Sequence, residues 1–114
     1  VKVHCVGLIF RDLLQVQGLY PSSYAFAADS SERDDYVGLE FAGTVVCQGN
    51  EAKQTYALGD RVFGIVSRQG AFRSHLLLNM VNVVKAPDGF SMEELASLPI
   101  AFLTVLLALK EGAR

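Results

Sequence analysis

The chain has 114 residues, enough for a single domain, and 51% of them are hydrophobic whereas 19% are charged. So much apolar surface excludes a disordered chain and predicts a packed core. The formal net charge is −2, so no broad positive field is available to attract a phosphate backbone. Nucleic acid is therefore excluded as the default partner.

The apolar segments are too short to cross a membrane. The longest uncharged run, residues 95–109, has 15 residues and contains Pro99, whereas a span needs about 20. Residues 1–10 form a short apolar stretch without a charged leader or a cleavage site, unlike a signal peptide. We therefore expect a soluble, cytoplasmic protein with no membrane partner, in which Cys5 and Cys47 are reduced and buried.

A strand and a short helix are predicted at the start of the chain. Residues 1–5 alternate between apolar and polar side chains, which is the period of a half-buried strand. Apolar residues at helical spacing then predict a helix from Ile9 that Gly18 stops. Residues 20–36 contain proline, serines and a charged string, which is the composition of a loop.

After Gly38 the pattern is typical of strands. Gly43 and Gly64 lie inside two of these strands, and interior glycines mark bends or a close approach of the backbone. We therefore predict a strongly curved sheet or a small barrel. The strands are expected within residues 39–48, 61–67, 71–78 and 81–86.

Two helices are predicted at the end of the chain. Ser91 and Glu94 have the spacing of a capping box, and the helix that they open meets Pro99, where a second helix begins. Residues 100–109 are apolar on nearly every side, with Thr104 the only polar member. Such a helix is normally buried on all faces. One small barrel covers one side, so we expect a following domain or a partner subunit to cover the other.

Standard catalytic fingerprints are missing from the sequence. It contains no dinucleotide-binding G-x-G-x-x-G, phosphate-binding loop, nucleophile elbow or H-E-x-x-H motif. Its cysteines and histidines are not spaced like zinc ligands. The residues alone therefore indicate a β-rich domain with a buried helix at its end.

Five segments, in order, resemble the enoyl reductase domains of modular or iterative polyketide synthases. The first is GLIFRDLL at 7–14 followed by GLYP at 18–21. The others are GLEFAG at 38–43, GDRVFG at 59–64, GAF at 70–72 and LPIAFLTVLLAL at 98–109. The series is similar to the zinc-independent, quinone-oxidoreductase-like branch of the medium-chain dehydrogenase/reductase superfamily.

The resemblance implies a mainly β fold with a few helices. Residues 1–98 would form a GroES-like, partly open β-barrel, and residues 99–114 a connecting helix toward an absent Rossmann domain. That domain would bind most of the NADPH, so the isolated chain is expected to be inactive. Zinc is not expected, because Ile9 and Leu39 stand where zinc-dependent relatives have cysteine and histidine. Glu40 is then expected to have a structural role.

The resemblance also implies a reaction and its residues. An α,β-unsaturated acyl thioester, carried by an acyl carrier protein or coenzyme A, would accept a hydride from NADPH at its β-carbon and a proton at its α-carbon. The chain would work within a multidomain polyketide or fatty-acid synthase. The implied site residues are Tyr20 for catalysis, Thr104 and Ile9 for the cofactor, and Phe10, Arg11 and Asp12 for the substrate pocket.

Simpler roles remain open for several of these residues. Tyr20 can be a packed aromatic residue, the Thr104 hydroxyl can bond to the carbonyl one turn back, and Arg11 with Asp12 can form a solvated or locally paired couple. His75 is expected to be a surface or packed histidine. The alternatives for the whole chain are a quinone-reductase-like oxidoreductase acting on small enones, and a non-catalytic remnant or interaction module. Ile9 favours the second of these, because the family's asparagine at this position forms hydrogen bonds that an isoleucine cannot replace.

Overall fold

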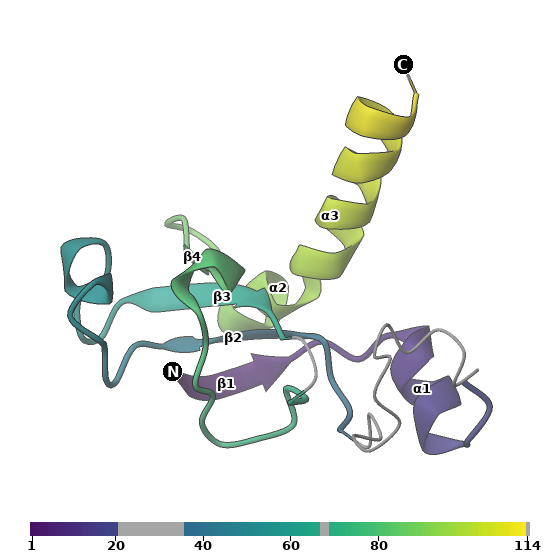
Figure 1. Cartoon of the computed structure of the whole chain (residues 1–114), viewed down its shortest axis with the longest axis horizontal. Coiled ribbons are helices and arrows are strands. Elements are labelled where there is room, and N and C mark those ends of the chain that lie inside the picture. Colours follow the sequence, from purple (N-terminus) through teal and green to yellow (C-terminus); the bar gives the residue numbers. More distant parts are fainter. Residues whose placement is uncertain (21–35, 67–68, 114) are drawn as a thin grey trace.

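The computed structural model describes residues 1–20, 36–66 and 69–113. In this part of the chain a short helix lies beyond one end of a four-stranded antiparallel sheet, and a long C-terminal helix projects away from the sheet (Figure 1). The strand order is β1-β2-β3-β4, so sequence neighbours are also sheet neighbours, and the expected mainly β fold is confirmed as an open sheet. The strands are β1 (Lys2–Val6), β2 (Glu40–Thr44), β3 (Arg61–Ile65) and β4 (Val83–Lys85).

The first helix ends, and the last two helices begin, where the sequence indicated, whereas the two 3-10 helices were not predicted. Gly18, with a φ of 70°, follows the first helix in the left-handed conformation that stops helices. Ser91 and Glu94 form the expected capping box, and Pro99 opens the last helix. The described helices are α1 (Phe10–Val16), α2 (Met92–Ser97), α3 (Pro99–Leu106) with a π-helical extension (Leu107–Gly112), and the 3-10 helices Ala52–Gln54 and Met80–Asn82.

Two glycines allow neighbouring strands to come close together. Gly43 pairs with Val3, and a Cβ atom at Gly43 would lie 2.2 Å from the Lys2 carbonyl oxygen. Gly64 pairs with Val83, and a Cβ atom there would lie 2.0 Å from the Asn82 carbonyl oxygen. These contacts are with backbone atoms, which cannot rotate away. The glycines inside the strands are therefore positions of close backbone approach, as the sequence predicted.

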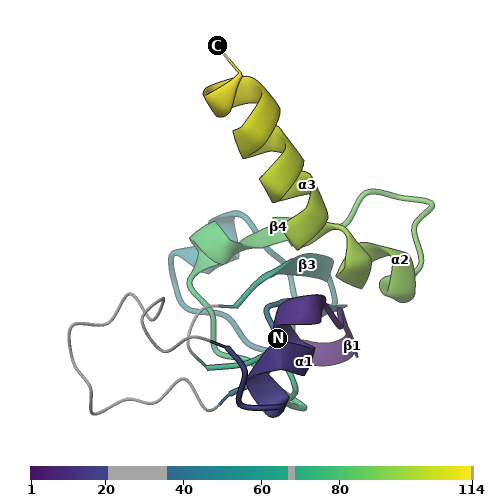
Figure 2. The same ribbon diagram turned by 90° about the vertical axis from the view of Figure 1, so that its right-hand side faces the viewer.

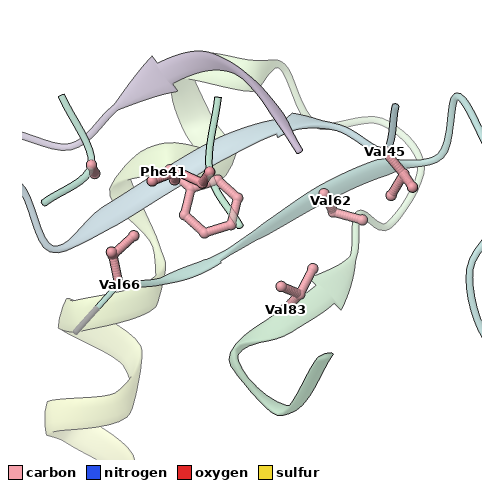
Figure 3. Packing of buried hydrophobic residues seen from close by; sticks show 7 residues of the cluster. Phe41, Val45, Val62, Val66 and Val83 are labelled. Atoms are coloured by element: carbon pink, nitrogen blue, oxygen red, sulfur yellow. The ribbon is translucent and has the colours of Figure 1, made fainter. Parts of the chain in front are cut away.

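The core lies on both faces of the sheet. Side chains of β2 alternate between the faces, so Phe41 packs in one cluster and Ala42 in the other. Figure 3 shows the larger cluster, in which Phe41 and Val62 are fully buried. The second cluster joins Ala42 to Leu95 and Ala96 of α2. The two central strands are thus held between apolar layers.

Two expectations from the sequence were wrong. Residues 71–78 form no strand; within them, only His75 makes an isolated bridge, to Lys2. A local turn explains the difference, because the Arg73 N–H donates to the Ala71 carbonyl instead of to a neighbouring strand. Cys47, expected in the core, is exposed, and the other free cysteine, near the end of β1, is half-buried.

The C-terminal helix projects from the sheet in both views (Figures 1 and 2). Pro99 is buried, but every residue in the range 101–113 is exposed. The large apolar side chains from Phe102 to Leu109 are between 40% and 69% exposed. Within the described residues the sheet therefore covers only the first turn of α3. In the same part of the chain, no helix has both the length and the apolar character that crossing a membrane requires.

Replacing Gly64 with alanine should destabilise the fold. The new methyl group would meet the Asn82 carbonyl oxygen at 2.0 Å, so β3 and β4 must separate, which costs about 2 kcal/mol or more of unfolding free energy. Gly49→Ala is the matched control, because a methyl group added at Gly49 would meet no atom within 4 Å beyond its chain neighbours and should change stability by less than about 0.5 kcal/mol. Urea unfolding of both variants measures the difference. Equal midpoints would contradict the close approach.

Candidate functional site

Asp12 anchors the segment that carries the first motif. Its side chain is 0% exposed. One carboxylate oxygen accepts from the Ile9 N–H at 2.9 Å and the other from the Gly38 N–H at 3.1 Å. The solvated alternative for Asp12 is therefore wrong. Burial without these donors would be costly for a carboxylate, so the two N–H groups fix α1 against the start of β2.

An open apolar groove of about 600 Å³ lies beside this anchor. Ile9, Phe10 and Asp12, three of the implied site residues, contribute to its wall, whereas Arg11 does not. Asp12 is the only polar side chain among the described lining residues, and both of its oxygens are already bonded to backbone N–H groups. The groove therefore favours hydrocarbon over polar ligands. The other described lining residues are Leu8, Leu13, Val16, Val37 and Phe72.

Tyr20 lies against Arg11 rather than in the wall of the groove. The guanidinium carbon of Arg11 is 4.8 Å from the centre of the Tyr20 ring, which is the geometry of a cation–π contact. Tyr20 is half-buried. Arg73 and Tyr36 form a second contact of this kind at 4.6 Å. α1 therefore presents apolar residues to the groove and a cation to the candidate tyrosine.

Thr104 lies on a different element. It is exposed on α3, and its hydroxyl donates to the Ile100 carbonyl at 2.7 Å. The described lining of the groove includes no residue of α3. This is the simpler role expected for Thr104, a hydrogen bond to the carbonyl one turn back in its own helix. The hydroxyl oxygen can still accept a hydrogen bond.

Glu40 connects α3 to residues 7–14, which carry the first motif and are called the motif segment below. Its side chain is 3% exposed, and Oε2 accepts from the Ile100 N–H at 2.9 Å. Gly7 is packed so closely that a Cβ atom there would lie 2.1 Å from Oε1. Burial raises the pKa of the Glu40 carboxyl, the Ile100 hydrogen bond opposes this, and the charge of Asp12 raises the pKa further. The sequence predicts a structural role for Glu40 but not its partner, because Ile100 lies 60 residues away.

Some wall residues could be found from the sequence and others could not. Leu13 and Val16 share the helical spacing of Phe10, so the pattern that predicted α1 also groups them. Phe72 belongs to the GAF segment, but nothing in the sequence places it or Val37 beside α1, because only the tertiary fold brings them there.

The described residues contain no group of three or more His, Cys, Asp or Glu side chains that could hold a metal ion. Ile9 and Leu39 have no side-chain atom that could ligate zinc. His75 is exposed, and its Nδ1 lies 3.2 Å from Ser74 Oγ.

Comparison with known families agrees with this architecture. The family model of the alcohol dehydrogenase GroES-like domain matches residues 1–88. The chain belongs to this family. The sheet, the motif segment and α1 all lie within the matched part of the GroES-like domain.

Similar proteins include polyketide synthases. The chain is 33% identical over 109 residues to probable polyketide synthase 1 of Dictyostelium discoideum, and 35% identical over 113 residues to the erythronolide synthase EryA2 of Saccharopolyspora erythraea. These matches cover 96% and 99% of the chain but 3% of each synthase. The crystal structure of CurK enoyl reductase superposes with a TM-score of 0.83 at 31% identity, over 96% of this chain and 33% of that one. The resemblance to polyketide synthase enoyl reductases is thus confirmed.

Removing the Asp12 carboxylate should destabilise the GroES-like domain. Asp12→Ala leaves the N–H groups of Ile9 and Gly38 without their acceptor, which costs about 3 kcal/mol of unfolding free energy. Asp12→Asn keeps one good acceptor and should lose less. Asp88→Ala, at an exposed turn, is the control and should change stability by less than about 1 kcal/mol. Chemical unfolding compares the three; similar losses in all of them would exclude the anchoring role.

The raised pKa of Glu40 predicts how its contribution depends on pH. The folded state holds this proton more tightly than the unfolded state does. The resulting stabilisation is fully present below the ordinary value of 4.5 and is lost as pH rises through the folded pKa. Glu40→Gln removes this dependence, so the stability of the wild type relative to the variant should fall as pH rises from about 4.

The pKa of Asp60 is shifted in the opposite direction to that of Glu40, so the two can be compared in the same experiment. The Ala57 N–H that Asp60 binds lowers its pKa from 3.8, so its contribution is present above that value and lost as pH falls. Asp60→Asn should therefore change the pH profile with the opposite sign. Unfolding measured across acid and neutral pH tests both, and identical slopes for the two variants would refute the assignment.

Proposed function

We propose that this GroES-like domain is part of an NADPH-dependent enoyl reductase of a polyketide synthase or fatty-acid synthase. The observation that carries the proposal is the apolar groove built by the motif segment, with Tyr20 held by the same helix. The similarity to polyketide synthases and to CurK enoyl reductase supports it. Because the chain spans a small part of those relatives, the activity belongs to a larger protein.

The groove suits the hydrocarbon part of an enoyl thioester. Its described wall contains Ile9, Phe10 and other apolar side chains, and each buried CH₂ group of a ligand gains about 0.8 kcal/mol. Asp12 cannot act as the proton donor, because its oxygens accept the N–H groups of Ile9 and Gly38. We assign it the role of holding the wall in place.

Two residues of the chain fit the nicotinamide end of the cofactor. Ile9 offers an apolar contact for the ring, and the Thr104 hydroxyl can accept a hydrogen bond because its own proton is donated to Ile100. When bound, NADPH supplies the hydride that is added to the β-carbon. The phosphates would be bound mainly by a second domain, because the described wall of the groove contains no Lys or Arg side chain.

Tyr20 is the proposed proton donor. As hydride reaches the β-carbon, the electron pair of the C=C bond moves toward the thioester carbonyl. The resulting enolate takes the phenolic proton at its α-carbon, and solvent returns a proton to Tyr20. Arg11, whose guanidinium carbon lies 4.8 Å from the ring centre, would hold the Tyr20 ring in place during this transfer.

The exposed side of α3 supports the proposed division of the chain. Residues 1–98 would be the GroES-like catalytic part and residues 99–114 the connecting helix. The apolar side chains of α3 would be covered by the nucleotide-binding domain, because contiguous apolar surfaces of this kind usually mark an interface. An acyl carrier protein of the same synthase, or coenzyme A, would carry the thioester.

A second candidate is a non-catalytic remnant that keeps the fold as an interaction module. Ile9 favours it, because this wall residue has no polar side-chain atom to orient a cofactor amide. The kinetic experiment on Tyr20 separates this candidate from the reductase.

Tyr20→Phe should abolish most of the reductase activity. In a reductase that contains this domain, loss of the phenolic proton should lower kcat for an enoyl thioester by about 10²-fold or more and change the stereochemistry at the α-carbon. Tyr36→Phe is the matched control, because Arg73 contacts that ring at 4.6 Å in the same way. Stopped-flow NADPH oxidation and chiral analysis of the product provide the measurements.

Three other results would be informative. An unchanged rate and stereochemistry for Tyr20→Phe would remove Tyr20 from the chemistry. An equal loss of activity in Tyr20→Phe and Tyr36→Phe would indicate that removing a hydroxyl from a tyrosine beside an arginine disturbs the structure. No turnover by the wild-type reductase, with correctly folded protein, would favour the non-catalytic candidate.

A further inference from the structure

Glu40 is a buried carboxylate that the proposed reaction does not use. It lies at the start of β2 and connects two segments far from it in the sequence. Its Oε2 accepts from the Ile100 N–H at 2.9 Å, 60 residues away, and its carboxyl packs against Gly7. Gly7 is also bonded to the same residue through the backbone, because its N–H donates to the Glu40 carbonyl at 3.2 Å. Glu40 therefore contacts both the strand that leads to the groove and the helix that carries Thr104.

The first turn of α3 needs an acceptor from elsewhere in the fold. Pro99 is its first residue and has no N–H, so Ile100 presents the first free donor. The residue before the helix, Leu98, has no side-chain acceptor and forms no cap. Glu40, on β2, supplies the missing cap. Its carboxylate also interacts favourably with the positive N-terminal end of α3.

A single residue, Leu98, separates α2 from α3. Leu98 joins the helices with a φ of −84° and a ψ of −42°, and α3 leaves α2 to project from the sheet (Figures 1 and 2). Beyond its first turn α3 is exposed. A change in the contact at that turn would therefore change the position of every later residue of the helix, including Thr104.

Gly7 provides the other half of the connection. Leu8 and Ile9, which follow it directly, belong to the wall of the groove. A Cβ atom at Gly7 would lie 2.1 to 2.5 Å from three atoms of the Glu40 side chain, so the carboxyl leaves space only for glycine. The wall and the helix thus meet the same buried group from two sides.

We propose that Glu40 is a positioning residue whose carboxylate sets the direction of α3, and with it the place of Thr104, relative to the wall formed by Leu8 and Ile9. The significance of Thr104 in this inference rests on the proposed function. The role of Glu40 in setting the direction of α3 does not depend on the proposed function.

The direction of α3 can be measured in the chain itself. Nitroxide labels at Gln17→Cys, at the end of α1, and Ala108→Cys, on the exposed helix, report the distance between the two elements after Cys5 and Cys47 are changed to serine. In the wild type, pulsed electron spin resonance should give one narrow distance distribution. Glu40→Leu should shift or broaden it, whereas Glu40→Gln, which keeps an acceptor oxygen, should largely restore it.

Glu94→Gln is the matched control. Glu94 also caps a helix, since it accepts from the Ser91 N–H at 2.9 Å, but it is exposed and has no contact of this kind with β2. The control should leave the distance distribution unchanged. Amide hydrogen exchange gives a second measurement: exchange at Ile100 should accelerate about tenfold in Glu40→Leu and remain unchanged in Glu94→Gln.

If Glu40→Leu does not fold, Gly7→Ala replaces it, because the added methyl group displaces the carboxyl without removing it. An unchanged distribution in a folded Glu40→Leu or Gly7→Ala variant would overturn the proposal, as would an equal change in Glu94→Gln. A wild-type reductase without enoyl thioester turnover would overturn the proposed function and leave the distance result standing. The two failures are therefore distinguishable.

Discussion

Two buried carboxylates in a mainly apolar domain depend on backbone N–H groups for their hydrogen bonds. A carboxylate removed from water is strongly destabilising unless donors replace its hydration. Asp12 finds them on Ile9 and Gly38, and Glu40 finds one on Ile100. These donors lie on three separate segments, so the carboxylates can be satisfied only when α1, β2 and α3 are in their native places. These hydrogen bonds therefore specify how α1, β2 and α3 are placed, which apolar packing alone would specify less exactly.

The same constraint shapes the surface that would meet a substrate. Because Asp12 turns inward to its backbone donors, α1 shows Phe10, Leu13 and Val16 to the groove. Arg11 is directed to Tyr20 instead. The residues of one short helix therefore have three roles: Asp12 anchors the helix, its apolar neighbours line the groove, and Arg11 contacts the ring of Tyr20.

Local signals in the sequence predicted the parts of the fold that depend on local chemistry. Gly18 ended α1, Pro99 opened α3, and Ser91 capped α2, because each acts through its own backbone or its near neighbours. Contacts between distant segments could not be read in this way. The burial of Asp12 depends on Gly38, and Phe72 reaches the groove only through the fold. Residues 71–78 have strand composition, yet a turn at Arg73 prevails.

The exposed apolar helix has a consequence for how such a protein is made. Until another surface covers α3, the side chains from Phe102 to Leu109 remain in contact with water. During synthesis, surfaces of this kind are recognised by chaperones and promote aggregation when they persist. The concentration at which this domain stays dispersed therefore depends in part on whether this helix is covered. A substitution in any surface that covers α3 would therefore reduce cellular abundance while leaving the apolar groove unchanged.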